Sequence, residues 1–154
     1  MGAAATVRRA ALADIDALLK LEALFPSDQM SRRSLRGFVA NPRADFLVAE
    51  TGGRVLGNLL LLSRAGSRTA RIYSVMVDPW ARGLGLAQQL VAAAEAAARR
   101  RHCTSIALEV RADNIPARRL YEKLGYTVDR ELPAYYDDSA DGLRLKRRLE
   151  PDDG

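Results

Sequence analysis

One segment constrains the fold of this chain more than any other, because two residue patterns meet in it. Residues 70–77 are a largely apolar run with the length of a strand, whereas residues 85–101 are rich in Ala, Leu, Gln, Glu and Arg, which favour a helix. The helical pattern places Leu86, Leu90 and Val91 on one buried stripe. A strand that turns directly into a long amphipathic helix is typical of helices packed on a sheet, so we predict an α/β architecture.

The rest of the chain alternates between the same two patterns. We expect further strands at residues 5–9, 46–50, 55–63, 105–110, 126–131 and 142–149, and further helices at residues 15–25, 32–40 and 115–123. Asp14, Ser31 and Asn114 are the expected caps of these three helices, and Pro26 is expected to end the first. The order β-α-α-β-β-β-α-β-α-β-β predicts a mixed α/β (α+β) sheet of about seven strands with helices on both faces.

Length and composition fit one domain. A chain of 154 residues with 48% hydrophobic and 28% charged residues buries a substantial core. We expect a single domain over residues 1–150 and an acidic tail at residues 151–154.

No apolar stretch approaches the roughly 20 residues of a membrane span, and no signal-peptide pattern opens the chain, so we expect a cytoplasmic protein. The single Cys103 and its neighbour His102 offer too few ligands for a metal site.

The net charge of +5 comes from arginines scattered along the chain. Such a surface attracts nucleic acid or an anionic cofactor. However, no aromatic residues interleave with the arginine groups, and no helix-turn-helix or zinc-finger spacing occurs. Nucleic acid is therefore not the expected partner.

The turn between the strand and the long helix has the features of an anion site. Gly83, Gly85 and Ala87 leave the backbone unobstructed, so the first N–H groups of the helix and its positive dipole end can surround a pyrophosphate. The turn lacks the Gly-Lys-Ser/Thr ending of a P-loop and the full spacing of the Rossmann fingerprint. Both of those nucleotide-binding motifs are disfavoured.

The same turn resembles the signature of a known family. Arg82-Gly83-Leu84-Gly85-Leu86-Ala87 is similar to the Arg/Gln-x-x-Gly-x-Gly/Ala motif of GNAT acetyltransferases, and the usual Val-x-Pro precedes it. The resemblance implies a GNAT-like, mostly antiparallel sheet, acetyl-CoA as co-substrate and no metal. The cofactor-binding residues that it implies are Arg82, Gly83, Leu84, Gly85, Leu86 and Ala87 for the pyrophosphate, the backbone of Val75, Met76 and Val77 for pantetheine, and Asn114.

A second block at residues 108–126 supports the same family. It ends in Leu-Tyr-Glu-Lys-Leu-Gly-Tyr, which is similar to the Leu-Tyr-Glu-x-Leu-Gly-Phe/Tyr of GNAT enzymes. The Leu-Glu-Val-Arg of residues 108–111 and the pattern Tyr135-Tyr136 followed by Asp141-Gly142 most resemble the bacterial ribosomal-protein-alanine N-acetyltransferases. The resemblance covers nearly the whole chain and implies an N-acetyltransferase.

The candidate catalytic residues lie in this second block. Glu109, in a predicted central strand, is either a general base for the attacking amine or one half of an ion pair with Arg111 or another arginine. Tyr121 is either the acid that protonates the leaving thiolate or a core aromatic. We favour the catalytic role for both. Asn114 caps a helix and, by the resemblance, also contacts the cofactor.

The acceptor is expected to be an amine. Tyr135, Tyr136, Asp137 and Asp138 have the composition of a loop, and the resemblance implies that they line the acceptor entrance, where acidic groups attract a protonated amine or a basic peptide. An α-amine has a pKa of ~7.7–8.0 against ~10.4 for lysine, so a protein or peptide N-terminus is the favoured acceptor.

Several alternatives remain open at this point. A small-molecule amine or a lysine side chain is the alternative acceptor. A non-catalytic acyl-CoA sensor or a nucleic-acid-binding module is the alternative of another class. The sequence is compatible with a monomer or a homodimer.

Overall fold

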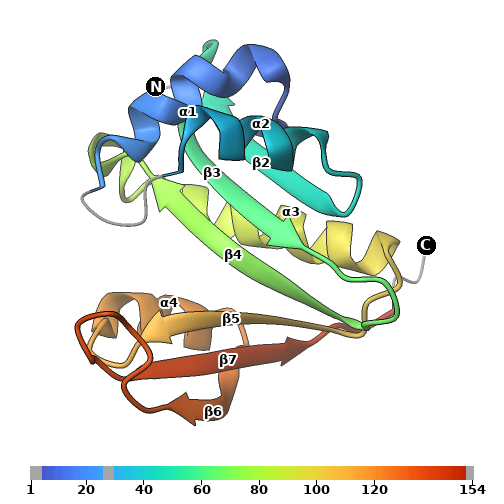
Figure 1. The fold of residues 1–154 in the computed structure, drawn as a ribbon, viewed down its shortest axis with the longest axis vertical. Helices are drawn as coiled ribbons and strands as arrows, with labels where there is room; N and C mark the ends of the chain where they lie inside the picture. The colour runs from blue at the N-terminus through green and yellow to red at the C-terminus, as the bar shows by residue number, and fades with distance from the viewer. Residues whose placement is uncertain (1–4, 26–29, 152–154) are drawn as a thin grey trace.

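The computed structural model describes residues 5–25 and 30–151 and contains every predicted strand and helix (Figure 1). The strands are β1 (Thr6–Arg9), β2 (Ala44–Thr51), β3 (Arg54–Leu62), β4 (Thr69–Val77), β5 (Ser105–Arg111), β6 (Thr127–Leu132) and β7 (Gly142–Arg148). The helices are α1 (Ile15–Glu22), α2 (Arg32–Ala40), α3 (Leu86–Arg100) and α4 (Ile115–Lys123), with 3₁₀ turns at Leu12–Asp14 and Pro79–Ala81. None of the helices in these ranges has the length and apolar character needed to cross a bilayer.

The seven strands form one sheet in the order β1-β2-β3-β4-β5-β7-β6. Every neighbouring pair is antiparallel except β4 and β5, which are parallel. A parallel pair needs a long crossover connection, and α3 provides it. The predicted mixed, mostly antiparallel sheet is therefore confirmed.

The parallel strands β4 and β5 pair over only part of their length. Their ladder stops at Ile72 and Leu108, although both strands continue beyond these residues. On its other side β4 stays paired with β3 through Val77, with Tyr73 as an extra, unpaired residue. Such a bulge bends a strand and increases its twist. Figure 1 shows the result, because β4 and β5 lie close at one end and diverge towards their carboxyl ends.

Helices cover both faces of the sheet, as predicted. α3 packs on β2, β3 and β4 over the larger core cluster, which also contains Tyr121 of α4. α1 and α2 cover the opposite face, where Leu18 and Phe46 are buried. A Cβ on Gly57 of β3 would come within 3.3 Å of Leu90 on α3, so the absence of a side chain there lets α3 approach the sheet closely.

Two predictions about the first helix are wrong. α1 ends at Glu22 rather than at Phe25, because the next residues form a tight turn in which the Phe25 N–H donates to the Glu22 carbonyl. Asp14 stands directly before α1 but does not cap it. Its carboxylate instead accepts hydrogen bonds from the Ala11 N–H at 2.7 Å and from Arg8 at 2.8 Å, which stabilise the preceding 3₁₀ turn. Pro26 lies outside the described residues.

The other predicted caps and boundaries agree with the structure. The Ser31 hydroxyl accepts from the Ser34 N–H at 3.1 Å, and the Asn114 side chain accepts from the Ala117 N–H at 3.2 Å. Apart from the end of α1, the predicted element boundaries lie within two residues of those observed.

Candidate functional site

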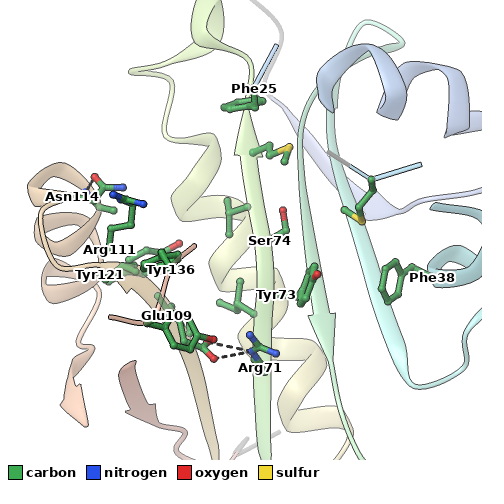
Figure 2. Close-up of a pocket in the computed structure, with 18 of the residues that line it drawn as sticks. Phe25, Phe38, Arg71, Tyr73, Ser74, Glu109, Arg111, Asn114, Tyr121 and Tyr136 are labelled. Carbon is green, nitrogen blue, oxygen red and sulfur yellow. Dashed lines mark hydrogen bonds and ion pairs between the residues drawn. The ribbon is translucent and has the colours of Figure 1, made fainter. Parts of the chain in front are cut away.

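A cavity of about 950 Å³ opens between the diverging ends of β4 and β5. The two strands, α4, the loop at residues 135–136 and the α1–α2 side of the molecule all contribute to its lining. In Figure 2, Arg71, Tyr73 and Ser74 belong to β4, Glu109 to β5, and Phe38 lies on the α2 side. The candidate site is therefore built on the separation of the one parallel strand pair.

Glu109 supplies the carboxylate of this cavity. Its side chain is 16% exposed. The Arg71 Nε donates a hydrogen bond to Glu109 Oε2 at 3.2 Å and lies 3.0 Å from Oε1 in an ion pair. The ion pair that the sequence left open is thus present, but its partner is Arg71 of β4 rather than Arg111. The dashed lines in Figure 2 mark this pair, which joins the two diverging strands and restrains the Glu109 carboxylate.

Tyr121 projects from α4 into the same cavity and is 7% exposed. Burial raises the pKa of Tyr121 to about 12, so the phenol keeps its proton at neutral pH. Its hydroxyl forms no hydrogen bond with any of the residues that the structure describes. The group is therefore an available proton donor.

A buried polar cluster lies behind Tyr121. The Tyr126 ring meets the Tyr121 ring edge-on, with centroids 5.5 Å apart, and the Tyr126 hydroxyl donates to Glu95 of α3 at 2.8 Å. Arg147 of β7 binds the other Glu95 oxygen at 2.8 Å. Burial and the neighbouring Glu95 raise the pKa of Tyr126. The cluster connects α3, β7 and the segment after α4, and it fixes the surface against which Tyr121 packs.

A second cavity of about 550 Å³ adjoins the first at the amino end of α3. Phe25, Val75, Ala117 and Tyr121 line both cavities. The predicted loop contributes Arg82, Gly83, Gly85, Leu86 and Ala87 to the second cavity. Leu84 does not line it and is 66% exposed, so of the six predicted loop residues only this one lies apart.

The backbone of the loop explains why glycine occurs there. Gly83 and Gly85 have φ angles of +88° and +74°, in the left-handed region that other residues rarely adopt. Gly85 is the N-cap of α3 and leaves the first turn of the helix without a side-chain cap. The free N–H groups of such a turn, together with the positive end of the helix dipole, can bind an anion, as the sequence predicts for this loop.

The predicted pantetheine strand has the required free backbone. Val75, Met76 and Val77 lie beyond the last β4–β5 pair, so within the described chain their β5-facing backbone groups have no strand partner. Val75 and Met76 line the first cavity, and Val75 and Val77 line the second. An extended ligand can pair with such an open strand edge.

The predicted acceptor loop divides into two parts. Tyr135 and Tyr136 line the first cavity, with their rings edge-on at 5.1 Å. Asp137 and Asp138 do not line it. Asp138 is bound by Arg111 at 2.7 Å, which holds the pKa of Asp138 below its usual value. The loop thus contributes aromatic rather than acidic surface to the cavity.

Asn114 lies on the lining of the first cavity, and its side chain also caps α4.

Residues 5–25 and 30–151 hold no group of three His, Cys, Asp or Glu side chains that could bind a metal ion. Cys103 is buried, which raises the pKa of its thiol, and His102 forms a left-handed turn between α3 and β5.

Sequence reasoning missed one half of the first cavity. Arg71, Tyr73 and Ser74 fall inside a strand whose apolar residues indicated core, and Phe38 falls inside a short helix. The available signal was the presence of polar residues at alternate positions in β4. Their exposure depends on the bulge and on the distance to β5, which involve segments far apart in the chain.

Comparisons with known proteins identify the family of this chain. Residues 12–126 match the model of the acetyltransferase (GNAT) family. The chain is 32% identical over 143 residues to an uncharacterized N-acetyltransferase of Methanocaldococcus jannaschii, covering 92% of this chain and 90% of that protein. It is 30% identical over 138 residues to a Bacillus subtilis protein named provisionally as a [ribosomal protein bS18]-alanine N-acetyltransferase, covering 89% and 90%.

A solved structure shows the same fold over nearly the whole chain. Ard1 from Thermoplasma volcanium matches with a TM-score of 0.86 at 28% identity, covering 96% of this chain and 99% of that one. The chain therefore belongs to the acetyltransferase (GNAT) family and is an N-acetyltransferase.

Proposed function

We propose that this enzyme moves the acetyl group of acetyl-CoA onto the α-amine of a protein or peptide N-terminus. The observation that carries the proposal is that the two cavities adjoin. Val75 and Tyr121 line both, so a molecule that occupies the anion site at α3 can reach the space beside Glu109. One cavity then serves the acyl donor, and the remainder of the other serves the acceptor.

The residues present fit acetyl-CoA. The uncapped first turn of α3, with Gly83 and Gly85 before it, suits a pyrophosphate, and Arg82 adds a cation to the same cavity. The unpaired backbone of residues 75–77 suits the amide groups of pantetheine. When bound, the cofactor supplies the acetyl thioester.

Two side chains of the first cavity supply the proton transfers. Glu109 accepts a proton from the acceptor ammonium, which leaves a neutral amine to attack the thioester carbonyl carbon. As the carbon–sulfur bond breaks, the Tyr121 hydroxyl donates its proton to the departing sulfur, and the second proton that the attacking nitrogen loses on forming the amide restores the Tyr121 hydroxyl. The Arg71 contact holds Glu109 in place, and the Tyr126 contact holds Tyr121.

The α-amine is the favoured acceptor for two reasons. An α-amine with a pKa near ~8 loses its proton more readily than a lysine near ~10.4, so one partly buried carboxylate is a sufficient base. The Bacillus subtilis relative is named for an alanine of a protein, and an alanine side chain has no nitrogen, so that name refers to an α-amine. The Tyr135–Tyr136 pair in the first cavity suits a peptide acceptor.

A peptide that carries both kinds of amine tests the proposal. We would supply labelled acetyl-CoA and a peptide with a free N-terminal alanine and one internal lysine, and locate the label by fragmentation mass spectrometry. The same peptide with a formylated N-terminus and a polyamine serve as competing acceptors. We expect label on the α-amine alone. Label on the lysine or polyamine instead, or binding of acetyl-CoA without any transfer, overturns the proposal.

A further inference from the structure

Arg71 has hydrogen-bonding capacity that the proposed chemistry does not use. It lies on β4 immediately before the parallel strands separate, and its side chain is 44% exposed in the first cavity. Only its Nε contacts Glu109. Within the described chain its two terminal nitrogens form no hydrogen bond, so four of the five N–H groups of the guanidinium remain available.

The guanidinium is nevertheless held in position. Glu109 binds its Nε, and the guanidinium carbon lies 5.5 Å from the centroid of the Tyr73 ring, in a cation–π contact. A planar guanidinium fixed in this way presents its remaining N–H groups as a fork that matches a carboxylate. The bulge at Tyr73 thus positions the ring as well as bending the strand.

No other charged side chain that the structure describes in this cavity has unused hydrogen-bonding groups in the same way. Arg111 also lines it, but its terminal nitrogens bind Asp138 at 2.7 and 3.3 Å and its Nε binds Asp113. Glu109 is the carboxylate of the lining, and Arg71 already binds it. Among the described residues of the lining, the cavity therefore offers an unpaired cationic donor and no unpaired carboxylate, which favours an anionic group on the acceptor.

We propose that Arg71 binds a carboxylate of the acceptor, so that the enzyme prefers N-termini with Asp or Glu as the first or second residue. This inference rests on the proposed function. An α-amine that contacts Glu109 lies next to Arg71, because the two side chains are 3.0 Å apart, and successive residues of the acceptor are about 3.8 Å apart. The preference is opposite to the basic acceptor expected from Asp137 and Asp138, which lie outside the lining.

Two matched peptide pairs test the preference. The two peptides of the first pair begin Ala-Glu and Ala-Gln, and those of the second pair begin Asp-Ala and Asn-Ala. The remaining sequence is the same in all four. For the wild-type enzyme we expect kcat/KM to be about tenfold higher for the carboxylate peptide of at least one pair, the size of one charge-assisted hydrogen bond. In Arg71→Met the ratio should fall to about one, and Arg71→Lys, which keeps the charge but loses the fork, should give an intermediate ratio.

Arg71 also contacts Glu109, so its replacement can change the rate with every peptide. The ratio of kcat/KM between the two peptides of a pair cancels this effect, because both peptides use the same base in the same enzyme. Arg111→Met is the matched control, and its ratio should stay near the wild-type value because Asp138 already occupies the terminal nitrogens of Arg111. Equal acetylation of all four peptides by the wild type, or a ratio that survives Arg71→Met, overturns this inference and leaves the proposed function standing. Absence of α-amine acetylation with every peptide overturns both.

Discussion

Replacing Tyr121 with phenylalanine deletes one hydroxyl where the two cavities meet and keeps the ring in its edge-on contact with Tyr126. The pKa of Tyr121 is raised to about 12, whereas a thiol has a pKa of about 8.5. Complete proton transfer from Tyr121 to a free thiolate is therefore uphill by about 5 kcal/mol. General acid catalysis raises the rate of a reaction by about 10²–10⁴-fold, and an acid as weak as Tyr121 is expected to give an enhancement at the low end of this range. We expect kcat to fall about 10²-fold with little change in acetyl-CoA affinity.

The assay is single-turnover transfer from preloaded acetyl-CoA, which isolates the chemical step. Tyr126→Phe is the matched control, because it deletes the same group from the adjoining ring. The Tyr126 hydroxyl donates to buried Glu95, so its loss should lower the free energy of unfolding by about 1–3 kcal/mol and change kcat less than about threefold. Tyr121→Phe should show the reverse, because its hydroxyl has no partner among the described residues.

Two results would refute the assigned role of Tyr121. A wild-type single-turnover rate in Tyr121→Phe would show that another group protonates the sulfur. Equal losses of kcat in the two variants, with equal losses of stability, would show that both tyrosines act through packing alone.

The remaining predictions concern pH, the cofactor loop and the core. Because the pKa of Tyr121 is raised, wild-type kcat should not decline between about pH 8 and 10, and a decline centred near pH 10 would indicate a phenol of ordinary acidity. Gly85→Val should weaken acetyl-CoA binding at least about tenfold by calorimetry, whereas Gly66→Val, with a similar φ of +78° in a distant turn, should cost similar stability, about 1–2 kcal/mol, and leave affinity unchanged. Burial raises the pKa of Asp45, but hydrogen bonds from two arginines outweigh burial, so the pKa is lowered overall. The ionised Asp45 therefore contributes to the free energy of unfolding above about pH 4, and this contribution is lost as the pH falls below that value. Asp45→Asn should therefore cost about 2–4 kcal/mol in urea unfolding at pH 7 and flatten the acid dependence, and an unchanged free energy of unfolding would contradict this.

The fold was predictable where the deciding interactions are local. The caps of α2 and α4 join residues three positions apart, and the buried stripe of α3 follows from helical spacing alone. Asp14 was assigned as a cap because its type and place in the chain are typical of one. Its partner Arg8 is brought close by the turn before α1, so local propensity was overridden by an ion pair.

The site was predictable to the extent that it coincides with continuous motifs. Glu109, Tyr121 and most of the predicted pyrophosphate loop line the cavities. They could be predicted as site residues because each belongs to a block of consecutive residues with a known pattern. Arg71 belongs to no such block, and its partner Glu109 is 38 residues further along the chain. The neutralisation of Asp138 by Arg111, across 27 residues, was hidden for the same reason.

A single topological feature links the two halves of the site. β4 and β5 are the parallel pair, so the chain must cross from the carboxyl end of β4 to the amino end of β5, and α3 begins directly after β4. The positive end of α3 and the carboxyl ends of both strands therefore share one edge of the sheet. The bulge at Tyr73 and the end of the ladder at Ile72 open the sheet at that same edge. Deleting Tyr73 would remove the bulge and should let the ladder extend along β5. The backbone of residues 75–77 would then be paired and the first cavity closed, so this variant should lose transfer and bind acetyl-CoA more weakly by calorimetry. Unchanged affinity for acetyl-CoA would show that the open edge of β4 does not hold the cofactor.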